Sequence, residues 1–140
     1  IQEGLLHKNG YKNPFLQHIF LESFLEKDRP PYYNTQQKLD LHLILCSIES
    51  LPSLDQICFI SLSNILDWSD SEQLQLWIQK LRELPTGAMI LIRQLNNTIN
   101  WDSIFHPYFT RLDNTKYQDI DRSLFYNQMV LYQRANSQWP

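Results

Sequence analysis

The chain has 140 residues, of which 43% are hydrophobic, and its 12 basic and 15 acidic side chains give a net charge of −3. The composition excludes a disordered chain, and the charge leaves no basic stripe to neutralise phosphates, so we expect no nucleic-acid partner. No apolar run reaches the roughly 18–20 residues that span a bilayer.

The first predicted element is an amphipathic helix over residues 13–27. Asn13 can cap this helix, and Pro14 stands at the first helical position, where proline is tolerated. The helix ends before Pro30-Pro31, because proline cannot donate a backbone hydrogen bond. Its apolar stripe consists of Phe15, Ile19, Phe20 and Phe24.

The next predicted elements are a short helix over residues 35–40 and a short strand over the apolar run 41–45. Cys46 follows this run directly, and Cys58 lies in the next apolar run. Free cysteines are commonly buried in proteins of a reducing compartment. We therefore expect two buried free thiols in a cytoplasmic protein rather than a disulfide.

A β-α-β unit is predicted over residues 56–95. Residues 56–62 (QICFISL) and 88–95 (AMILIRQL) are almost continuously apolar, which is typical of parallel strands covered by helices on both faces. Between them, Ser69 and Glu72 form the capping box of a helix that extends to about residue 84. The crossover is expected to be right-handed.

The C-terminal part predicts two more strands, over residues 109–113 and 128–134, which form an antiparallel hairpin at the edge of the sheet. Residues 101–109 are ambiguous and fit a helix interrupted by a proline. The expected fold class is α/β, a Rossmann-like and mostly parallel sheet with a terminal antiparallel hairpin. This domain covers residues 35–140, after a helical lead-in over residues 1–34.

Glycine is scarce, with only Gly4, Gly10 and Gly87 in the whole chain. No two of them are spaced for a GxG turn, so the chain carries neither a dinucleotide-binding fingerprint nor a P-loop. The chain therefore combines the strand and helix order of a nucleotide-binding sheet with no glycine-rich turn.

Polar residues follow each predicted parallel strand, at the edge where such sheets bind ligands. Parallel strands would bring them to one rim. Loop chemistry explains the same residues equally well, because serine, asparagine and aspartate are ordinary turn residues. The set is Ser47 after the first run, Ser63, Asn64 and Asp67 after the second, and Asn96 and Asn97 after the third.

Other catalytic signals are weak. His18 and Glu22 share a helix face and are expected to form an ion pair rather than a metal site, so we expect no metal. Arg122 precedes an aromatic run that ends at Tyr126, so its guanidinium can clamp a carboxylate or a phosphate, or form a structural salt bridge. The tyrosines at 32–33 fit either core packing or contact with lipid headgroups.

Four short segments occur in an order that resembles a known family. They are NPF at 13–15, CS at 46–47, LSNILDW at 62–68 and DRSLFY at 121–126. The chain resembles the carboxyl-terminal part of the S-adenosylmethionine:diacylglycerol 3-amino-3-carboxypropyltransferases, which begin betaine-lipid headgroup synthesis. The family segments LS(D/N)IFE(Y/W) and DR-x-FFY are the closest parallels.

The resemblance implies the fold of the class I S-adenosylmethionine-dependent enzymes, a sheet whose last strand is antiparallel. Residues 41–45, 56–62 and 88–95 would be its third, fourth and fifth strands. The first two strands and the glycine-rich turn have no counterpart here. Because the first strand lies beside the fourth in such folds, residues 56–62 would keep an unpaired edge. The expected partner is this missing N-terminal half, from the same precursor or another chain.

The resemblance also implies a reaction. S-adenosylmethionine would be a substrate whose sulfonium activates the transferred group, and the acceptor would be a diacylglycerol hydroxyl at the membrane surface. The implied cofactor contacts are Ser47, Ser63, Asn64 and Asp67, and the implied acceptor-site residues are Tyr126 and Arg122.

Two departures from the family keep other functions open. Ser47 stands where similar enzymes often place an acidic residue near the adenine, and residues 93–96 (RQLN) lack the family's aromatic residue after the fifth strand. These changes fit a catalytically silent binding or regulatory module, or a methyltransferase that acts on a small molecule.

Overall fold

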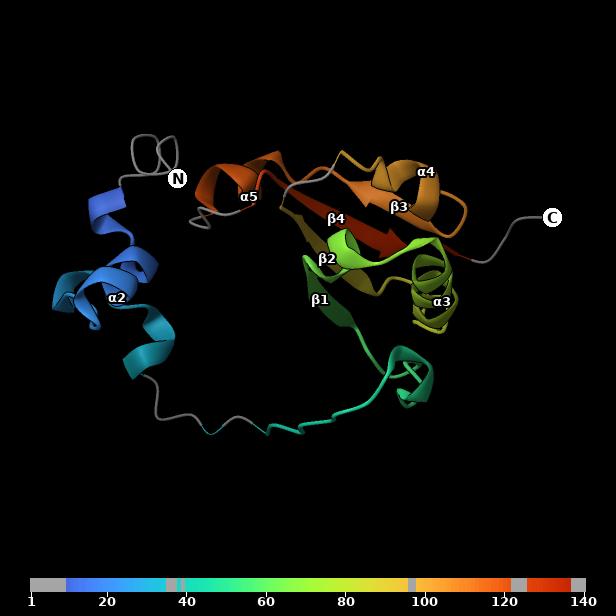
Figure 1. Cartoon of the computed structure of the whole chain (residues 1–140), viewed down its shortest axis with the longest axis horizontal. Coiled ribbons are helices and arrows are strands. Elements are labelled where there is room, and N and C mark those ends of the chain that lie inside the picture. Colours follow the sequence, from blue (N-terminus) through green and yellow to red (C-terminus); the bar gives the residue numbers. More distant parts are fainter. Residues whose placement is uncertain (1–9, 35–37, 39, 96–97, 122–125, 137–140) are drawn as a thin grey trace. The chain divides into compact units, whose positions relative to one another are not determined.

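The computed structural model describes residues 10–34, 38, 40–95, 98–121 and 126–136 (Figure 1). The chain divides into two compact units. A helical unit comprises residues 1–44 and 121–125, and a sheet unit comprises residues 45–120 and 126–140. Within the described residues, no helix is both long enough and apolar enough to cross a membrane.

The described residues of the helical unit form one α-helix and three short 3-10 helices. The predicted cap is confirmed, because the Asn13 Oδ1 accepts a hydrogen bond of 3.0 Å from the Phe15 backbone. The α-helix is shorter than predicted, because Glu22 takes a left-handed conformation (φ 55°) that ends it. The elements are η1 (Gly10–Lys12), α2 (Pro14–Leu21), η2 (Glu26–Asp28) and η3 (Pro31–Asn34).

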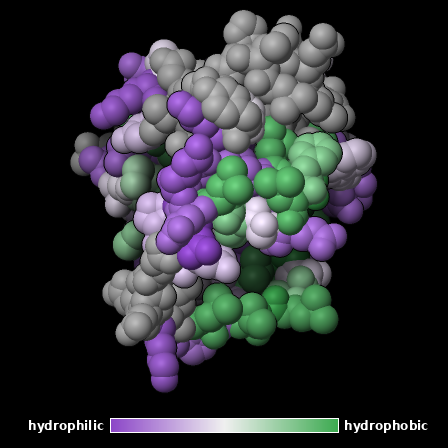
Figure 2. All heavy atoms as spheres, turned by 90° about the vertical axis from the view of Figure 1, so that its left-hand side faces the viewer, coloured by the Kyte–Doolittle hydropathy of each residue, from purple (hydrophilic) through white to green (hydrophobic). Residues whose placement is uncertain are grey.

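The buried side of α2 carries a polar residue. Gln17 is buried; its Oε1 accepts a hydrogen bond from the Leu25 backbone (3.0 Å), and its Nε2 donates one to Asp28 (2.7 Å). These bonds hold the returning chain against the helix. The predicted apolar stripe points outward instead, because Phe15, Ile19 and Phe20 are all exposed. Figure 2, which looks onto this unit, shows hydrophobic side chains at the surface.

In the sheet unit, the described residues form four strands in the order β1-β2-β4-β3. β1 and β2 are parallel, as predicted, and β4 is antiparallel to both of its neighbours. The predicted antiparallel pair thus lies at one edge of the sheet, with β4 inside and β3 outside. The strand bounds are Phe59–Ser63 for β1, Met89–Gln94 for β2, Phe109–Leu112 for β3 and Gln128–Arg134 for β4.

The helix between the parallel strands, α3 (Ser71–Leu81), starts one residue later than predicted. The capping box pairs Asp70 with Gln73 rather than Ser69 with Glu72. The Ser69 hydroxyl donates instead to the Ile65 carbonyl at 3.2 Å. Both pairs have the spacing of a capping box, so the pattern alone could not choose between them.

Helix α3 and the short helix α4 (Trp101–Phe105) cover one face of the sheet. Phe105 of α4 is fully buried and stacks on Tyr132 of β4, with ring centroids 4.8 Å apart. The Tyr132 hydroxyl donates a hydrogen bond of 2.6 Å to Asp102, which also accepts one of 2.8 Å from Arg111. The main apolar residues of this covered face are Leu62, Leu81, Ile90, Ile92, Phe105, Val130 and Tyr132.

We call the opposite side the open face of the sheet; its residues include Phe59, Ser61, Met89, Leu91, Arg93 and Leu131. Neither α3 nor α4 packs on it. Phe59 is 50% exposed and Met89 is 37% exposed. Along β2, buried side chains alternate with more exposed ones. Within the described residues, the prediction that helices cover both faces of the sheet is therefore not met.

The predicted strand over residues 41–45 is wrong. These residues have no regular secondary structure, and all of them are exposed. An apolar run becomes a strand only where another strand pairs with it, and no described strand is available there. Cys46 and Cys58 are both free, but they are exposed rather than buried as predicted. The predicted helix over residues 35–40 falls mostly outside the described residues.

Candidate functional site

The carboxyl end of β1 has an irregular backbone. The register with β2 shifts between Ser61 and Ser63, which face Leu91 and Ile92 respectively. Ser63 has a φ of 48°, a conformation that costs a non-glycine residue about 1–3 kcal/mol. Bulges and strain of this kind gather where strands present side chains to ligands. This end of the parallel pair is also where ligands bind in open α/β sheets.

Two predicted site residues meet at this point. The Ser63 hydroxyl and the Tyr126 hydroxyl share a hydrogen bond of 2.7 Å across 63 residues of sequence. The segment after Tyr126 is held to β2, because the Asn127 backbone donates a hydrogen bond of 2.9 Å to the Gln94 carbonyl. Asn64 is partly buried next to Ser63, whose hydroxyl also donates to its side-chain oxygen at 3.4 Å.

Asp67 links the ends of the two parallel strands. It lies in η5 (Ile65–Trp68), and its Oδ2 accepts a hydrogen bond of 2.6 Å from the backbone of Leu95, just beyond β2. Its Oδ1 is buried and accepts no hydrogen bond from the described residues. A carboxylate oxygen can accept more than one hydrogen bond. Asp67 therefore holds the rim together and keeps capacity to accept a hydrogen bond from a ligand donor.

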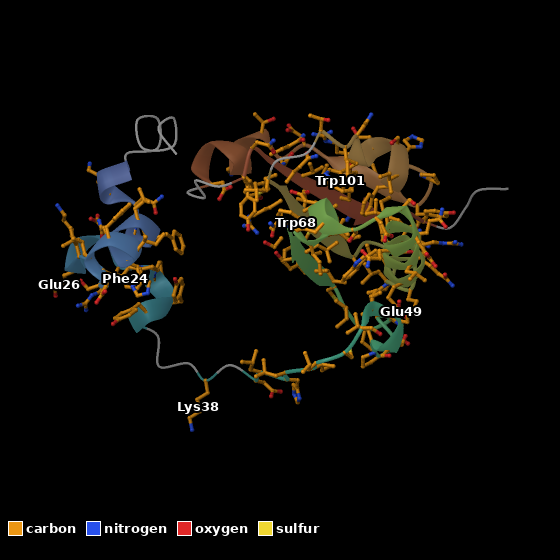
Figure 3. All side chains as sticks on the ribbon, viewed as in Figure 1. Phe24, Glu26, Lys38, Glu49, Trp68 and Trp101 are labelled. Atoms are coloured by element: carbon orange, nitrogen blue, oxygen red, sulfur yellow. The ribbon has the colours of Figure 1, made fainter. Side chains whose placement is uncertain are left out.

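An exposed indole stands next to this carboxylate. Trp68 is 74% exposed, and Figure 3 places it beside the ends of β1 and β2. An exposed tryptophan supplies a broad apolar surface with one hydrogen-bond donor. It adds a platform against which a ring or an alkyl group of a ligand can rest.

Arg93 belongs to the same site, although no sequence motif marks it as a site residue. Its guanidinium carbon lies 5.9 Å from the centroid of the Tyr126 ring, and its Nη1 donates to the Ser61 hydroxyl at 3.5 Å. The signal that could have found it is its position, a single cation inside the apolar strand AMILIRQL. A cation in such a strand is costly to desolvate unless it has a partner.

Ser47 is not brought to this site. It precedes η4 (Ile48–Ser50), and its hydroxyl donates to Ser50 at 3.2 Å. Close by in the chain, Glu49 lines a small hollow with Gln79 and Lys80 from the second half of α3 and with Glu83, just beyond this helix (Figure 3). Because α3 runs back from the end of β1 to the start of β2, this hollow lies at the opposite end of the sheet from Ser63. The prediction that Ser47 lies at the same rim as Ser63 requires residues 41–45 to form a parallel strand, and they do not.

The remaining predicted residues, Arg122, Asn96 and Asn97, lie outside the described residues. Within the described part of the chain, no group of three or more histidine, cysteine, aspartate or glutamate side chains could hold a metal ion. His18 stacks on Phe24, with ring centroids 4.9 Å apart. Comparison with protein-family models, curated proteins and solved structures finds no match.

Proposed function

We propose that the chain is the carboxyl-terminal half of an S-adenosylmethionine-dependent transferase, which moves an alkyl group to a hydroxyl acceptor. One observation carries the proposal. The segments LSNILDW and DRSLFY, which are far apart in the sequence, meet through the hydrogen bond between Ser63 and Tyr126. This contact lies at the carboxyl end of a parallel pair, the ligand-binding edge of such sheets.

The sheet supports the same proposal. A parallel pair joined through α3 is followed by an antiparallel last strand, β4, which lies directly beside it. The resemblance implies an antiparallel last strand in the same way. The generic α/β architecture also hosts many unrelated functions, so the site rather than the fold supports a transferase.

The residues at the rim fit a ligand with several hydrogen-bond donors. S-adenosylmethionine carries an amino group, ribose hydroxyls and an adenine amine, and its sulfonium supplies a leaving group that is already activated. Asp67 has a buried oxygen without a hydrogen bond from the described residues, which can accept from such a donor. The hydroxyls of Ser63 and Tyr126 can orient the acceptor, whose oxygen bonds to the transferred carbon as the carbon–sulfur bond breaks. The neutral thioether leaves, and the proton of the acceptor hydroxyl is released to water.

The proposed site needs a further part along β1. β1 pairs only with β2 among the described strands, so its other edge offers unpaired backbone groups. We place there the strands and the glycine-rich turn of the missing N-terminal half, from the same precursor or another polypeptide.

The proposed acceptor is a diacylglycerol, and the proposed transferred group is aminocarboxypropyl. The helical unit supports a lipid acceptor, because it exposes large apolar and aromatic side chains that suit a membrane surface. These are Phe15, Ile19, Phe20, Leu21, Leu25, Tyr32 and Tyr33. A catalytically silent module is the second candidate. Residues 93–96 (RQLN) favour it, because they lack the aromatic residue that the family has after its fifth strand.

Calorimetry on the full-length protein tests the proposal. We expect S-adenosylmethionine to bind, and Tyr126→Phe to lower transfer of the labelled aminocarboxypropyl group to diacylglycerol in mixed micelles. Tyr117→Phe is the matched control, because Tyr117 is an exposed tyrosine of α5 (Thr115–Ile120). Binding without transfer would favour the silent module, and absence of S-adenosylmethionine binding would overturn both the transferase and its cofactor.

A further inference from the structure

The three arginines that lie on strands differ in their partners. Arg111 donates to Asp102 at 2.8 Å, and Arg134 donates to the Tyr108 carbonyl at 2.8 Å. Arg93 has only the 3.5 Å contact to the Ser61 hydroxyl and the ring of Tyr126. A distance of 3.5 Å is at the outer limit of a hydrogen bond. Of the three, Arg93 alone lacks a strong acceptor among the described residues.

The position of Arg93 leaves its guanidinium accessible to a ligand, because its contact with Ser61 is exposed. It is partly buried, and its neighbours Ile92 and Gln94 in β2 are both buried against the helices. Arg93 therefore projects to the open face, on the same side as Ser61. A guanidinium has five N–H donors, and desolvating it without acceptors is unfavourable. A ligand oxyanion would satisfy these donors.

The surroundings of Arg93 favour an anion over any other ligand. The guanidinium carbon of Arg93 lies 5.9 Å from the centroid of the Tyr126 ring, at the outer limit of a cation–π contact. The hydrogen bond between the Ser63 and Tyr126 hydroxyls uses one of their two hydrogens, so when Ser63 donates to Tyr126, the Tyr126 hydroxyl can donate to a further oxygen. Among the described residues, Arg93 forms no ion pair with Asp67 or with another carboxylate. A planar guanidinium pairs best with a carboxylate or a phosphate, in a two-bond geometry.

We propose that Arg93, with the hydroxyl of Tyr126, binds an oxyanion on the open face at the carboxyl end of β2. The oxyanion is a carboxylate or a phosphate ester of a substrate. In the transferase proposed above it would be the carboxylate of the transferred group, because diacylglycerol carries no oxyanion; a phosphate ester would require a different acceptor. This assignment deepens the proposed function by naming what the site recognises, but the oxyanion site itself does not require S-adenosylmethionine.

The test compares Arg93→Gln and Arg93→Lys with Arg82→Gln in the full-length protein. Arg82 is the matched control, because its guanidinium carbon also lies near a tyrosine ring, 4.3 Å from the centroid of Tyr108. It differs in its place, since it follows α3 directly and does not lie on a strand. Calorimetric titration with inorganic phosphate is expected to give about tenfold weaker binding in Arg93→Gln, the size of a lost charge-assisted hydrogen bond. Arg93→Lys should lose less phosphate affinity, because lysine keeps the positive charge but cannot make the paired hydrogen bonds of a guanidinium. Arg82→Gln should bind phosphate as tightly as the parent protein does.

Two further probes identify the source of the oxyanion. Weaker binding of S-adenosylhomocysteine in Arg93→Gln assigns the carboxylate of the transferred group. Weaker binding of glycerol 3-phosphate alone assigns a phosphate ester and removes diacylglycerol as the acceptor. Equal phosphate affinity in Arg93→Gln and the parent, or an equal loss in Arg82→Gln, would overturn the oxyanion site. Phosphate binding that depends on Arg93 in a protein that does not bind S-adenosylmethionine would keep this site and remove the transferase.

Discussion

On the face of the sheet that α3 and α4 cover, Ile90, Ile92 and Phe105 are completely buried, whereas Phe59 on the open face is half exposed. The covered face is continuous and apolar, and a tyrosine and a carboxylate link its helices to its strands. The open face mixes apolar side chains with Ser61, Arg93 and the hydroxyls at the end of β1. The difference separates the residues that hold the fold from those that are arranged for a ligand.

The largest expected effect is on the covered face. Phe105→Ala should lower the free energy of unfolding by about 3–5 kcal/mol, because it removes a buried ring and leaves a cavity. Phe59→Ala, on the open face, should change it by about 0.5 kcal/mol or less. Chemical denaturation followed by tryptophan fluorescence measures both. Similar losses from the two variants would show that the open face is also a packed core.

A smaller effect is expected at the polar link between β4 and α4. Tyr132→Phe removes the hydrogen bond to Asp102 but keeps the stacked ring, so it should cost about 1–1.5 kcal/mol. The same denaturation experiment measures it, with Tyr117→Phe as the exposed control. A loss as large as that of Phe105→Ala would indicate that the ring itself had moved.

The acid dependence of stability probes the same link. The hydrogen bond from Tyr132, and then that from Arg111, lower the pKa of Asp102 below its ordinary value of 3.8. The ionised carboxylate therefore stabilises the fold above that value, and this contribution is lost as the pH falls through the lower folded-state pKa. Asp102→Asn should flatten the fall in stability on acidification. Parallel curves for the parent and the variant would contradict this role.

The sheet was largely predictable from sequence, because its signals are local. Residues 128–134 coincide with β4, and residues 88–95 contain β2 with one extra residue at each end. Polar neighbours and the turn at Gly87 (φ 86°) mark these bounds. The run 41–45 resembled a strand equally well, but a strand also requires a partner, which local composition does not reveal.

The site was predictable only in part. Its place after a predicted parallel strand selects Ser63, and the family resemblance adds a role for Tyr126, but no local pattern shows that their hydroxyls meet. Ser47 was chosen by its place after a strand that did not form. Arg93 was missed because one cation in a strand has no motif, and its lack of a strong acceptor is visible only in three dimensions.

The smallest effect that we predict concerns the strain at the end of β1. Ser63→Ala and Ser63→Gly both remove the hydroxyl that meets Tyr126, but only glycine adopts a positive φ without steric cost. The glycine variant should therefore be more stable than the alanine variant by about 1 kcal/mol. The difference between the two free energies of unfolding isolates the backbone, since the lost hydrogen bond is common to both.

Ser61 supplies the control for this last comparison, because it lies in the regular part of the same strand. There the order should reverse, with Ser61→Gly less stable than Ser61→Ala, since glycine in an ordinary strand costs about 0.5–1 kcal/mol. The same order at both positions would mean that Ser63 carries no strain. A reversal confined to Ser63 would show that the fold holds this residue in an unfavourable conformation, at the point where its hydroxyl reaches Tyr126.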